Sequence, residues 1–311
     1  MIISASRRTD IPSYYSDWFL NRIKEGLVYV RNPMNAHRIS KVPLSPGVVD
    51  GIVFWTKNPT PMIKRLDELK EYPYYFQFTL TAYANDVELN LPSKNDVLIP
   101  AFRRLADKIG PARVIWRYDP ILINSKYTKE YHAEYFEKIA RKLQGCTEKC
   151  IISFIDMYRN TVSHARELEL SEVSEQDQRE LAKALADIAH DCGLNIDACT
   201  EPIDLSQYGI GHARCIDGRL LERISGNRLK IEKDKNQREA CGCVSSMDIG
   251  MYNTCKNGCL YCYANYNEKL VESHWLAHSV NAPLISGQVN ADDVITERKA
   301  VSNRDDQISF F

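Results

Sequence analysis

Short β-rich runs alternate with longer helical runs along most of this chain, and no other feature constrains its fold as strongly. The predicted strands are Ile2–Thr9, Gly51–Thr56, Tyr74–Ala82, Arg113–Tyr118, Cys150–Met157 and Leu194–Cys199. The predicted helices between them are Ser16–Glu25, Pro61–Glu71, Asn95–Ile109, Thr128–Leu143 and Ser174–Cys192. Strands joined by helices return in the same direction, so the sequence predicts an α/β protein with a parallel sheet.

Three of these strands carry polar residues on one face near their carboxyl ends. Residues two positions apart share a face, and the polar sets are Ser4, Ser6, Arg8 and Asp10, then Gln77, Thr79 and Thr81, then Asp197, Cys199 and Glu201. An open doubly wound sheet, the alternative, buries both faces and is mostly Val, Ile and Leu. The polar faces therefore favour an incomplete (βα)6 TIM-like barrel over residues 1–205, with its site at the mouth where the strands end.

Cysteines are concentrated late in the chain, because seven of the ten lie between positions 199 and 262. Disulfides are rare in a reducing cytoplasm, so this clustering indicates metal. Three of the seven have the compact spacing Cys255-x-x-x-Cys259-x-x-Cys262. Such thiolates can hold three corners of a four-iron cluster and leave the last iron open to a small molecule. We therefore expect residues 206–311 to form a cysteine-rich, iron-sulfur lobe packed on the barrel mouth.

Two further questions about the cysteines stay open at the level of sequence. A structural zinc site is the alternative for the three-cysteine motif, with Cys241 or Cys243 as the fourth ligand of a tetrahedral site. Together with Cys199 and Cys215, these two cysteines also make up the number of thiolates that a second, fully ligated [4Fe-4S] cluster requires. Ordinary buried thiols are the alternative for this second group.

Composition and charge exclude some classes of function. The formal net charge is -1, which gives no electrostatic reason to expect nucleic acid or an anionic membrane as a partner. No stretch approaches the roughly 20 apolar residues that a membrane span requires, and the first residues contain no long apolar run. We expect a cytoplasmic protein.

Charged residues cluster at or just beyond the predicted carboxyl ends of the strands. The candidates for catalysis are Arg8, Asp10, Lys57, Arg117, Asp119 and Glu201, with Arg7 and Asp156 beside them. A barrel gathers its ligand-binding groups at this end. Arginine and lysine there suit a carboxylate, and aspartate and glutamate suit hydroxyl groups or protons. Ion pairs between neighbouring loops are the structural alternative for each residue alone.

The three-cysteine spacing, with Tyr261 directly before the last cysteine, resembles the cluster motif of the radical SAM superfamily. The whole chain also resembles an uncharacterised bacterial family that shares Ser-Arg-Arg-Thr-Asp-Ile-Pro at residues 6–12, Phe-Trp-Thr-Lys-Asn-Pro at residues 54–59 and this late cluster. More distantly, the strand ends Thr56-Lys57 and Arg117-Tyr-Asp-Pro are similar to those of spore photoproduct lyase-like radical SAM proteins. In the superfamily the cysteine loop follows the first strand, whereas here it follows the last.

The resemblance implies an iron-sulfur enzyme that reductively cleaves S-adenosylmethionine (SAM) to a 5'-deoxyadenosyl radical, which then acts on a substrate in the mouth. It implies that Cys255, Cys259 and Cys262 bind a [4Fe-4S] cluster, and that Tyr261, Thr56, Lys57 and Asn58 contact SAM. It also implies a reductant such as ferredoxin or flavodoxin as a partner. A non-catalytic binding protein stabilised by zinc or iron and sulfur is the alternative.

Overall fold

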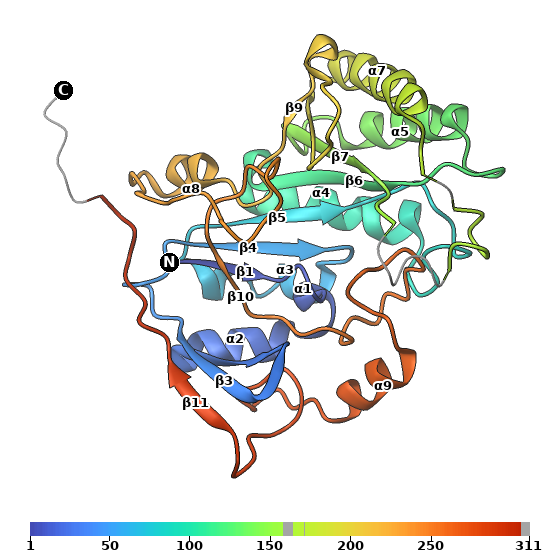
Figure 1. Ribbon diagram of the computed structural model, residues 1–311. Coiled ribbons are helices and arrows are strands. Elements are labelled where there is room, and N and C mark those ends of the chain that lie inside the picture. Colours follow the sequence, from blue (N-terminus) through green and yellow to red (C-terminus); the bar gives the residue numbers. More distant parts are fainter. Residues whose placement is uncertain (158–163, 171, 306–311) are drawn as a thin grey trace, which may run out of the picture.

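A sheet of eight parallel strands forms the centre of the computed structural model, in the order β10-β1-β4-β5-β6-β7-β8-β9 (Figure 1). Its strands are β1 (Ile2–Ala5), β4 (Gly51–Thr56), β5 (Tyr74–Thr79), β6 (Val114–Ile121), β7 (Lys149–Phe154), β8 (Asn195–Ala198), β9 (Gly211–His212) and β10 (Met247–Asp248). The structure describes residues 1–157, 164–170 and 172–305. The predicted α/β class with parallel strands is confirmed.

Helices connect most of these strands. They are α1 (Ile11–Tyr14), α2 (Ser16–Glu25), α3 (Thr60–Ile63), α4 (Ile99–Ile109), α5 (Lys129–Leu143), α7 (Glu175–Asp191), α8 (Gly218–Ser225) and α9 (Glu268–Leu276). Single turns of other helix types are η1 (Leu66–Leu69), η2 (Lys94–Leu98), η3 (Pro111–Arg113) and η4 (Ser206–Tyr208). Helix α2 has its predicted bounds because Gly26, at φ 72°, provides a left-handed cap. In the described ranges, none of the helices combines the length and the apolar character needed to cross a bilayer.

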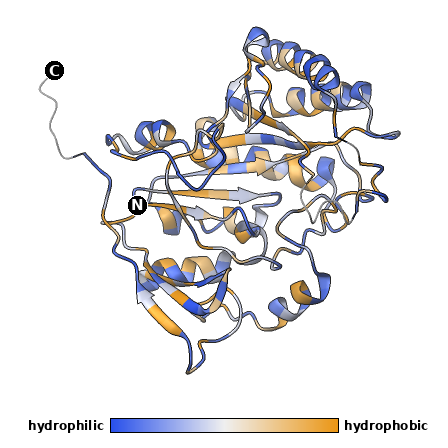
Figure 2. Cartoon of the chain, in the orientation of Figure 1, coloured by the Kyte–Doolittle hydropathy of each residue, from blue (hydrophilic) through white to orange (hydrophobic). Residues whose placement is uncertain are grey.

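Successive residues of the strands pack into two different cores. Ile3, Ile52 and Phe76 belong to the larger core, which contains the inner sides of α2, α4, α5 and α7. Their neighbours Ile2 and Val53 belong to a smaller core on the opposite face, where α8 and the segment around it pack. This is the alternation expected of a sheet covered on both sides. Figure 2 shows the same pattern, with apolar strands between helices of mixed hydropathy.

The sheet has two edges rather than a closed ring, because β10 and β9 end the strand order. Two edges fit an open sheet and an incomplete barrel alike, so the incomplete TIM-like barrel stays a prediction, and the polar strand faces that favoured it are present. The late segment between β9 and β10 crosses these faces (Figure 1). Gln77 Nε2 donates to the carbonyl oxygen of Cys215 at 2.9 Å, and the Ser4 hydroxyl donates to Asp248 at 2.6 Å. Part of the polarity thus serves contacts within the protein.

A second, smaller sheet was missed by the sequence prediction. It contains the antiparallel strands β2 (Leu27–Asn32) and β3 (Asn35–Pro43), and β11 (Val294–Glu297) pairs in parallel with β3. The strand β11 lies in a late stretch for which no strand was predicted from the sequence. It brings the late part of the chain next to the early hairpin (Figure 1).

A buried histidine in the larger core makes stability depend on pH. His132 bonds to the Tyr118 hydroxyl at 2.8 Å and to the Leu122 carbonyl oxygen at 2.7 Å. Burial lowers the pKa of His132 to about 4, against about 6.5 in an unfolded chain. Its contribution to stability is therefore complete above pH 6.5 and is lost as the pH falls through 4.

The unfolding free energy of the wild type should fall between pH 7 and pH 4, and His132 should account for about 3 kcal/mol of that fall. We expect the His132→Gln variant to lack this part of the pH dependence. Denaturant titrations at a series of pH values measure this difference. The matched control is His190→Gln, because the side chain of His190 is 92% exposed, and its curve should follow the wild type. A His132→Gln curve that also followed the wild type would contradict the assignment.

Candidate metal centre

One cavity of about 880 Å³ lies at the carboxyl ends of the strands in the large sheet. Each of β4 to β8 contributes residues to its wall at or near its carboxyl end, as Lys57 does after β4 and Thr79 does at the end of β5. Of the residues predicted as catalytic, four line this cavity: Arg8, Lys57, Arg117 and Asp119. Arg7 and Asp156 line it as well. The cavity is therefore where the sequence placed a ligand site.

Both groups of late cysteines reach the same cavity. Cys262 lines it from the three-cysteine motif, and the second group contributes Cys199, Cys215, Cys241 and Cys243. All ten cysteines of the chain are free thiols in the structure. The fold thus gathers thiols from distant parts of the chain around one space.

The three-cysteine loop packs against the ends of β1 and β4. The Tyr263 hydroxyl donates to the carbonyl oxygen of Arg7 at 2.7 Å, and Asn257 Nδ2 donates to the Asp10 carboxylate at 3.2 Å. These contacts join residues more than 240 positions apart in sequence. The loop therefore lies beside the first strand in space although it follows β10, the last strand of the large sheet, in sequence.

Burial dominates the chemistry of the three thiols. It raises the pKa of Cys255, Cys259 and Cys262, that of Cys259 to about 12. The negative charges of Asp10, Cys259 and Cys262 raise the pKa of Cys255 further. The three thiols are therefore close enough to interact electrostatically. A bound metal deprotonates its thiol ligands, so metal binding here would release protons.

The sulfur atoms are not arranged around a single point. Among the described residues, no three cysteines bring all of their sulfur atoms within 4.8 Å of one another. The group that meets this distance is instead His37, Asp292 and Asp293, of which His37 and Asp292 are exposed beside the small sheet. Four thiolates around one zinc ion stand about 3.8 Å apart, given zinc–sulfur bonds of about 2.3 Å. The described thiols are therefore not positioned as the ligands of a single ion.

A buried ionic network contacts the three-cysteine motif through Tyr261. The Glu88 carboxylate accepts hydrogen bonds from Lys57 Nζ at 2.7 Å, Lys94 Nζ at 2.6 Å and the Thr81 hydroxyl at 2.9 Å, and it also accepts one from Tyr261. Burial favours the protonated acid, but the two lysines outweigh it and lower the pKa of Glu88 to about 2. Lys57 also donates to the Tyr261 hydroxyl at 2.7 Å. Sequence reasoning missed Glu88, which lies in a polar loop without a strand-end signal.

Asp10 positions three parts of the structure and does not line the cavity. Its buried carboxylate accepts the backbone N–H of Ser13 at 3.0 Å, the backbone N–H of Lys57 at 2.7 Å and the side-chain amide of Asn257. Burial raises the pKa of Asp10, and these hydrogen bonds oppose the rise. The prediction of Asp10 as catalytic is replaced by a positioning role, because both of its oxygen atoms are engaged within the protein.

Asp248, which the sequence did not single out, organises the end of β1. It accepts hydrogen bonds from the hydroxyls of Ser4 and Ser6, both at 2.6 Å, and from the backbone N–H of Arg7 at 2.9 Å. Arg8 Nε lies 4.0 Å from the same carboxylate. Asp248 was not identified from the sequence, because the hydrophobic residues around β10 do not repeat with the period of a helix or a strand.

Arg117 joins the strand ends to the second group of cysteines. Its Nε donates to Asp119 at 3.0 Å, and its Nη1 lies 2.9 Å from the sulfur atom of Cys215. Glu201 stands apart, because its carboxylate accepts the backbone N–H of Phe154 at 2.8 Å. Burial raises the pKa of Glu201 to about 7. Arg117 and Asp119 thus face the cavity, whereas Glu201 holds β7 to the loop after β8.

Two of the four residues predicted to contact SAM line the cavity, namely Tyr261 and Lys57. The other two shape the turn after β4. The Thr56 hydroxyl accepts the backbone N–H of Asn58 at 3.0 Å, and Asn58 Oδ1 accepts the backbone N–H of Thr60 at 3.2 Å. The side chains of Thr56 and Asn58 are therefore occupied in local hydrogen bonds.

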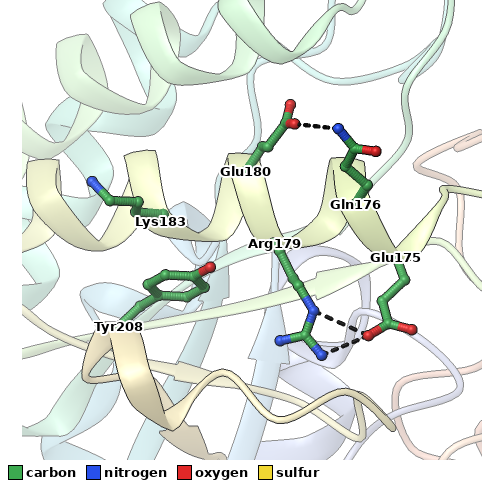
Figure 3. A pocket seen from close by; sticks show the side chains of 6 residues that line it. All are labelled: Glu175, Gln176, Arg179, Glu180, Lys183 and Tyr208. Atoms are coloured by element: carbon green, nitrogen blue, oxygen red, sulfur yellow. Dashed lines mark hydrogen bonds and ion pairs between the residues drawn. The ribbon is translucent and has the colours of Figure 1, made fainter.

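A second hollow, shown in Figure 3, lies between α7 and the turn that ends at Tyr208. Its charged and polar side chains bond to one another, since Arg179 Nε donates to Glu175 at 3.0 Å and Gln176 donates to Glu180 at 2.9 Å. These four residues are exposed or half-buried, and the hollow contains no thiol. The cavity at the strand ends is the better candidate for a functional site.

Comparison with known proteins gives one family match. A family model described as a domain of unknown function (DUF1848) matches residues 2–264. This range includes the three-cysteine motif, the second group of cysteines and every strand of the large sheet. No curated protein matches the chain.

Proposed function

The chain belongs to the DUF1848 family, and we propose that it is a radical SAM-type enzyme whose Cys255, Cys259 and Cys262 hold a [4Fe-4S] cluster. The observation that carries this proposal is the position of the three-cysteine loop, which packs on the ends of β1 and β4 and contributes Cys262 to the wall of the cavity. Three soft thiolates suit iron and sulfur. Three protein ligands leave one iron of the cluster for a small molecule.

The residues of this chain fit such a cluster in charge as well as in number. Lys57 is a buried cation whose pKa is raised, because Glu88 and Cys259 outweigh the opposing effect of burial. A permanently charged ammonium beside Cys259 favours the thiolate form over the thiol. When bound, the cluster supplies one electron for the reductive cleavage of SAM to methionine and a 5'-deoxyadenosyl fragment.

Other residues that line the cavity are suited to bind SAM and a substrate. We assign Tyr261 and Lys57 to SAM binding, because both line the cavity and each fixes the other through a 2.7 Å hydrogen bond. Arg8 and Arg117 are suited to carboxylates of SAM or of a substrate. We also propose that the sheet is the wall of an incomplete barrel and that the relation to spore photoproduct lyase-like proteins is a distant one.

A non-catalytic zinc-stabilised or iron-sulfur binding protein is the alternative function. A zinc site needs four ligands close to one ion, whereas no three cysteines in the described part of the chain meet the 4.8 Å limit. A purely structural cluster also gives no reason for a cavity of about 880 Å³ beside it. Both observations favour the enzyme. We propose a cytoplasmic reductant such as ferredoxin or flavodoxin as its partner.

SAM cleavage by the iron-loaded protein tests this proposal. Protein reconstituted anaerobically with iron and sulfide is expected to form 5'-deoxyadenosine when dithionite and SAM are added. The Cys259→Ala variant should form none above background. The matched control is Cys146→Ala, because Cys146 lies just before the amino end of β7 and does not line the cavity, and this variant should keep full activity.

The alternative function predicts different results in the same samples. A colourless protein with one zinc per chain would contradict the enzyme assignment. So would a brown iron-loaded wild type that forms no more 5'-deoxyadenosine than Cys259→Ala. Liquid chromatography of the nucleoside product and metal analysis of the same preparation separate these outcomes.

A further inference from the structure

Four cysteines outside the three-cysteine motif meet at one place in the fold. Cys199 follows β8, Cys215 precedes α8, and Cys241 and Cys243 precede β10. The sulfur atoms of Cys199 and Cys215 are 3.3 Å apart. The backbone N–H of Ile216, next to Cys215, donates to the sulfur atom of Cys243 at 3.4 Å. All four cysteines line the same cavity.

The surroundings of these thiols are positively charged. Arg117 Nη1 lies 2.9 Å from the Cys215 sulfur atom. Arg7 lines the same cavity, and its buried Nη2 has no hydrogen-bond partner among the described residues. A buried guanidinium nitrogen without a hydrogen-bond partner is unfavourable. An anionic group bound at this point would supply that partner. Four thiolates on a cluster core of charge +2 carry a total charge of -2, and Arg7 and Arg117 are cations beside them, of which Arg117 also pairs with Asp119.

We propose that Cys199, Cys215, Cys241 and Cys243 hold a second [4Fe-4S] cluster. The number of thiols matches the four ligands of such a cluster. In the described part of the chain, no three of these sulfur atoms lie within 4.8 Å of one another, so they are not arranged around a single ion. What supports the cluster is the gathering of four soft thiols and two arginines on one cavity.

Full ligation by the protein distinguishes this cluster from the first. With four thiolates, no iron is open to SAM, so the group serves one-electron transfer. In that step it accepts one electron from a low-potential reductant and releases one electron, and no bond is formed or broken. This inference concerns metal content and holds whether or not the three-cysteine motif cleaves SAM.

Iron analysis of three variants tests the proposal. The wild type, reconstituted anaerobically, is expected to hold about eight irons and eight sulfides per chain. The Cys199→Ser, Cys215→Ser double variant should hold about four, and so should Cys255→Ser, Cys259→Ser. The double variant Cys146→Ser, Cys192→Ser removes two thiols outside both groups and should keep about eight.

Electron paramagnetic resonance of the dithionite-reduced wild type gives a test that needs no variant. Two cluster signals are expected, and added SAM should change only one of them. Eight irons with no response to SAM would contradict the proposed enzyme and leave the second cluster in place. About four irons in the wild type, all lost in Cys255→Ser, Cys259→Ser, would overturn the second cluster. One zinc per chain, or a disulfide between Cys199 and Cys215 in anaerobic protein, would overturn it as well.

Discussion

The Glu88→Ala variant is expected to lose about 3–5 kcal/mol of unfolding free energy, because it leaves two buried ammonium groups without their counter-charge. The Glu88 side chain is 1% exposed, and those of Lys57 and Lys94 are 12% and 21% exposed. Lys94 is the more vulnerable of the two, because burial already lowers its pKa and Glu88 opposes that effect. Denaturant unfolding at pH 7 measures the loss.

A matched control comes from a more exposed glutamate that also pairs with two cations. Glu68 also pairs with two cations, Arg65 and Lys24, but its side chain is 30% exposed. Exposed pairs contribute about 0–1 kcal/mol, so Glu68→Ala should change the unfolding free energy by no more than that. Glu88→Gln, which keeps the shape and removes the charge, should lie between the two. Equal losses in Glu88→Ala and Glu68→Ala would show that burial does not set the strength of this network.

The same network should hold the three-cysteine loop. The backbone of Glu88 pairs with that of Cys259 in an isolated antiparallel bridge, and its carboxylate accepts a hydrogen bond from Tyr261. Glu88→Ala is therefore expected to release iron from the motif faster than Glu68→Ala does. Release of iron to a chelator, followed by absorbance, measures the difference.

The sequence predicted the helices and strands well where local chemistry ends them. The bounds of β4 were predicted exactly, because Lys57, Asn58 and Pro59 follow the strand directly. The hairpin of β2 and β3 was missed because its strands return through a short turn, Pro33-Met34, and not through a helix. A search for alternating strands and helices passes over such a hairpin.

The sequence predicted individual residues of the candidate site but not which of them contact one another. Strand-end residues such as Arg117 were found, because parallel strands must end at one edge. Glu88 and Asp248 were not found, because their roles come from partners that are distant in sequence, as the 244 positions between Ser4 and Asp248 show. The polar strand faces were interpreted as the inside of a barrel, whereas a late segment of the chain crosses them.

The Asp10→Ala variant should show how fold and site depend on one carboxylate. Asp10 accepts three hydrogen bonds from buried donors: the backbone N–H groups of Ser13 and Lys57 and the side chain of Asn257. A buried donor without a partner costs about 1–3 kcal/mol, so the loss of three should cost about 3–9 kcal/mol. The start of α1, the end of β4 and the three-cysteine loop should loosen together.

Asp217→Ala is the matched control, because Asp217 is also a buried aspartate at the start of a helix. Its carboxylate accepts one backbone N–H, from Arg219 at 3.0 Å, and loss of one such cap costs about 0.5–2 kcal/mol. Asp10→Asn keeps one accepting oxygen and should fall between the two variants in unfolding free energy. Asp10→Ala should also lose iron from the motif of Cys255, Cys259 and Cys262, since Asn257 lies between two of its ligands. If Asp10→Ala were destabilised no more than Asp217→Ala and kept its iron, the carboxylate would not be what joins the cysteine loop to the first strand.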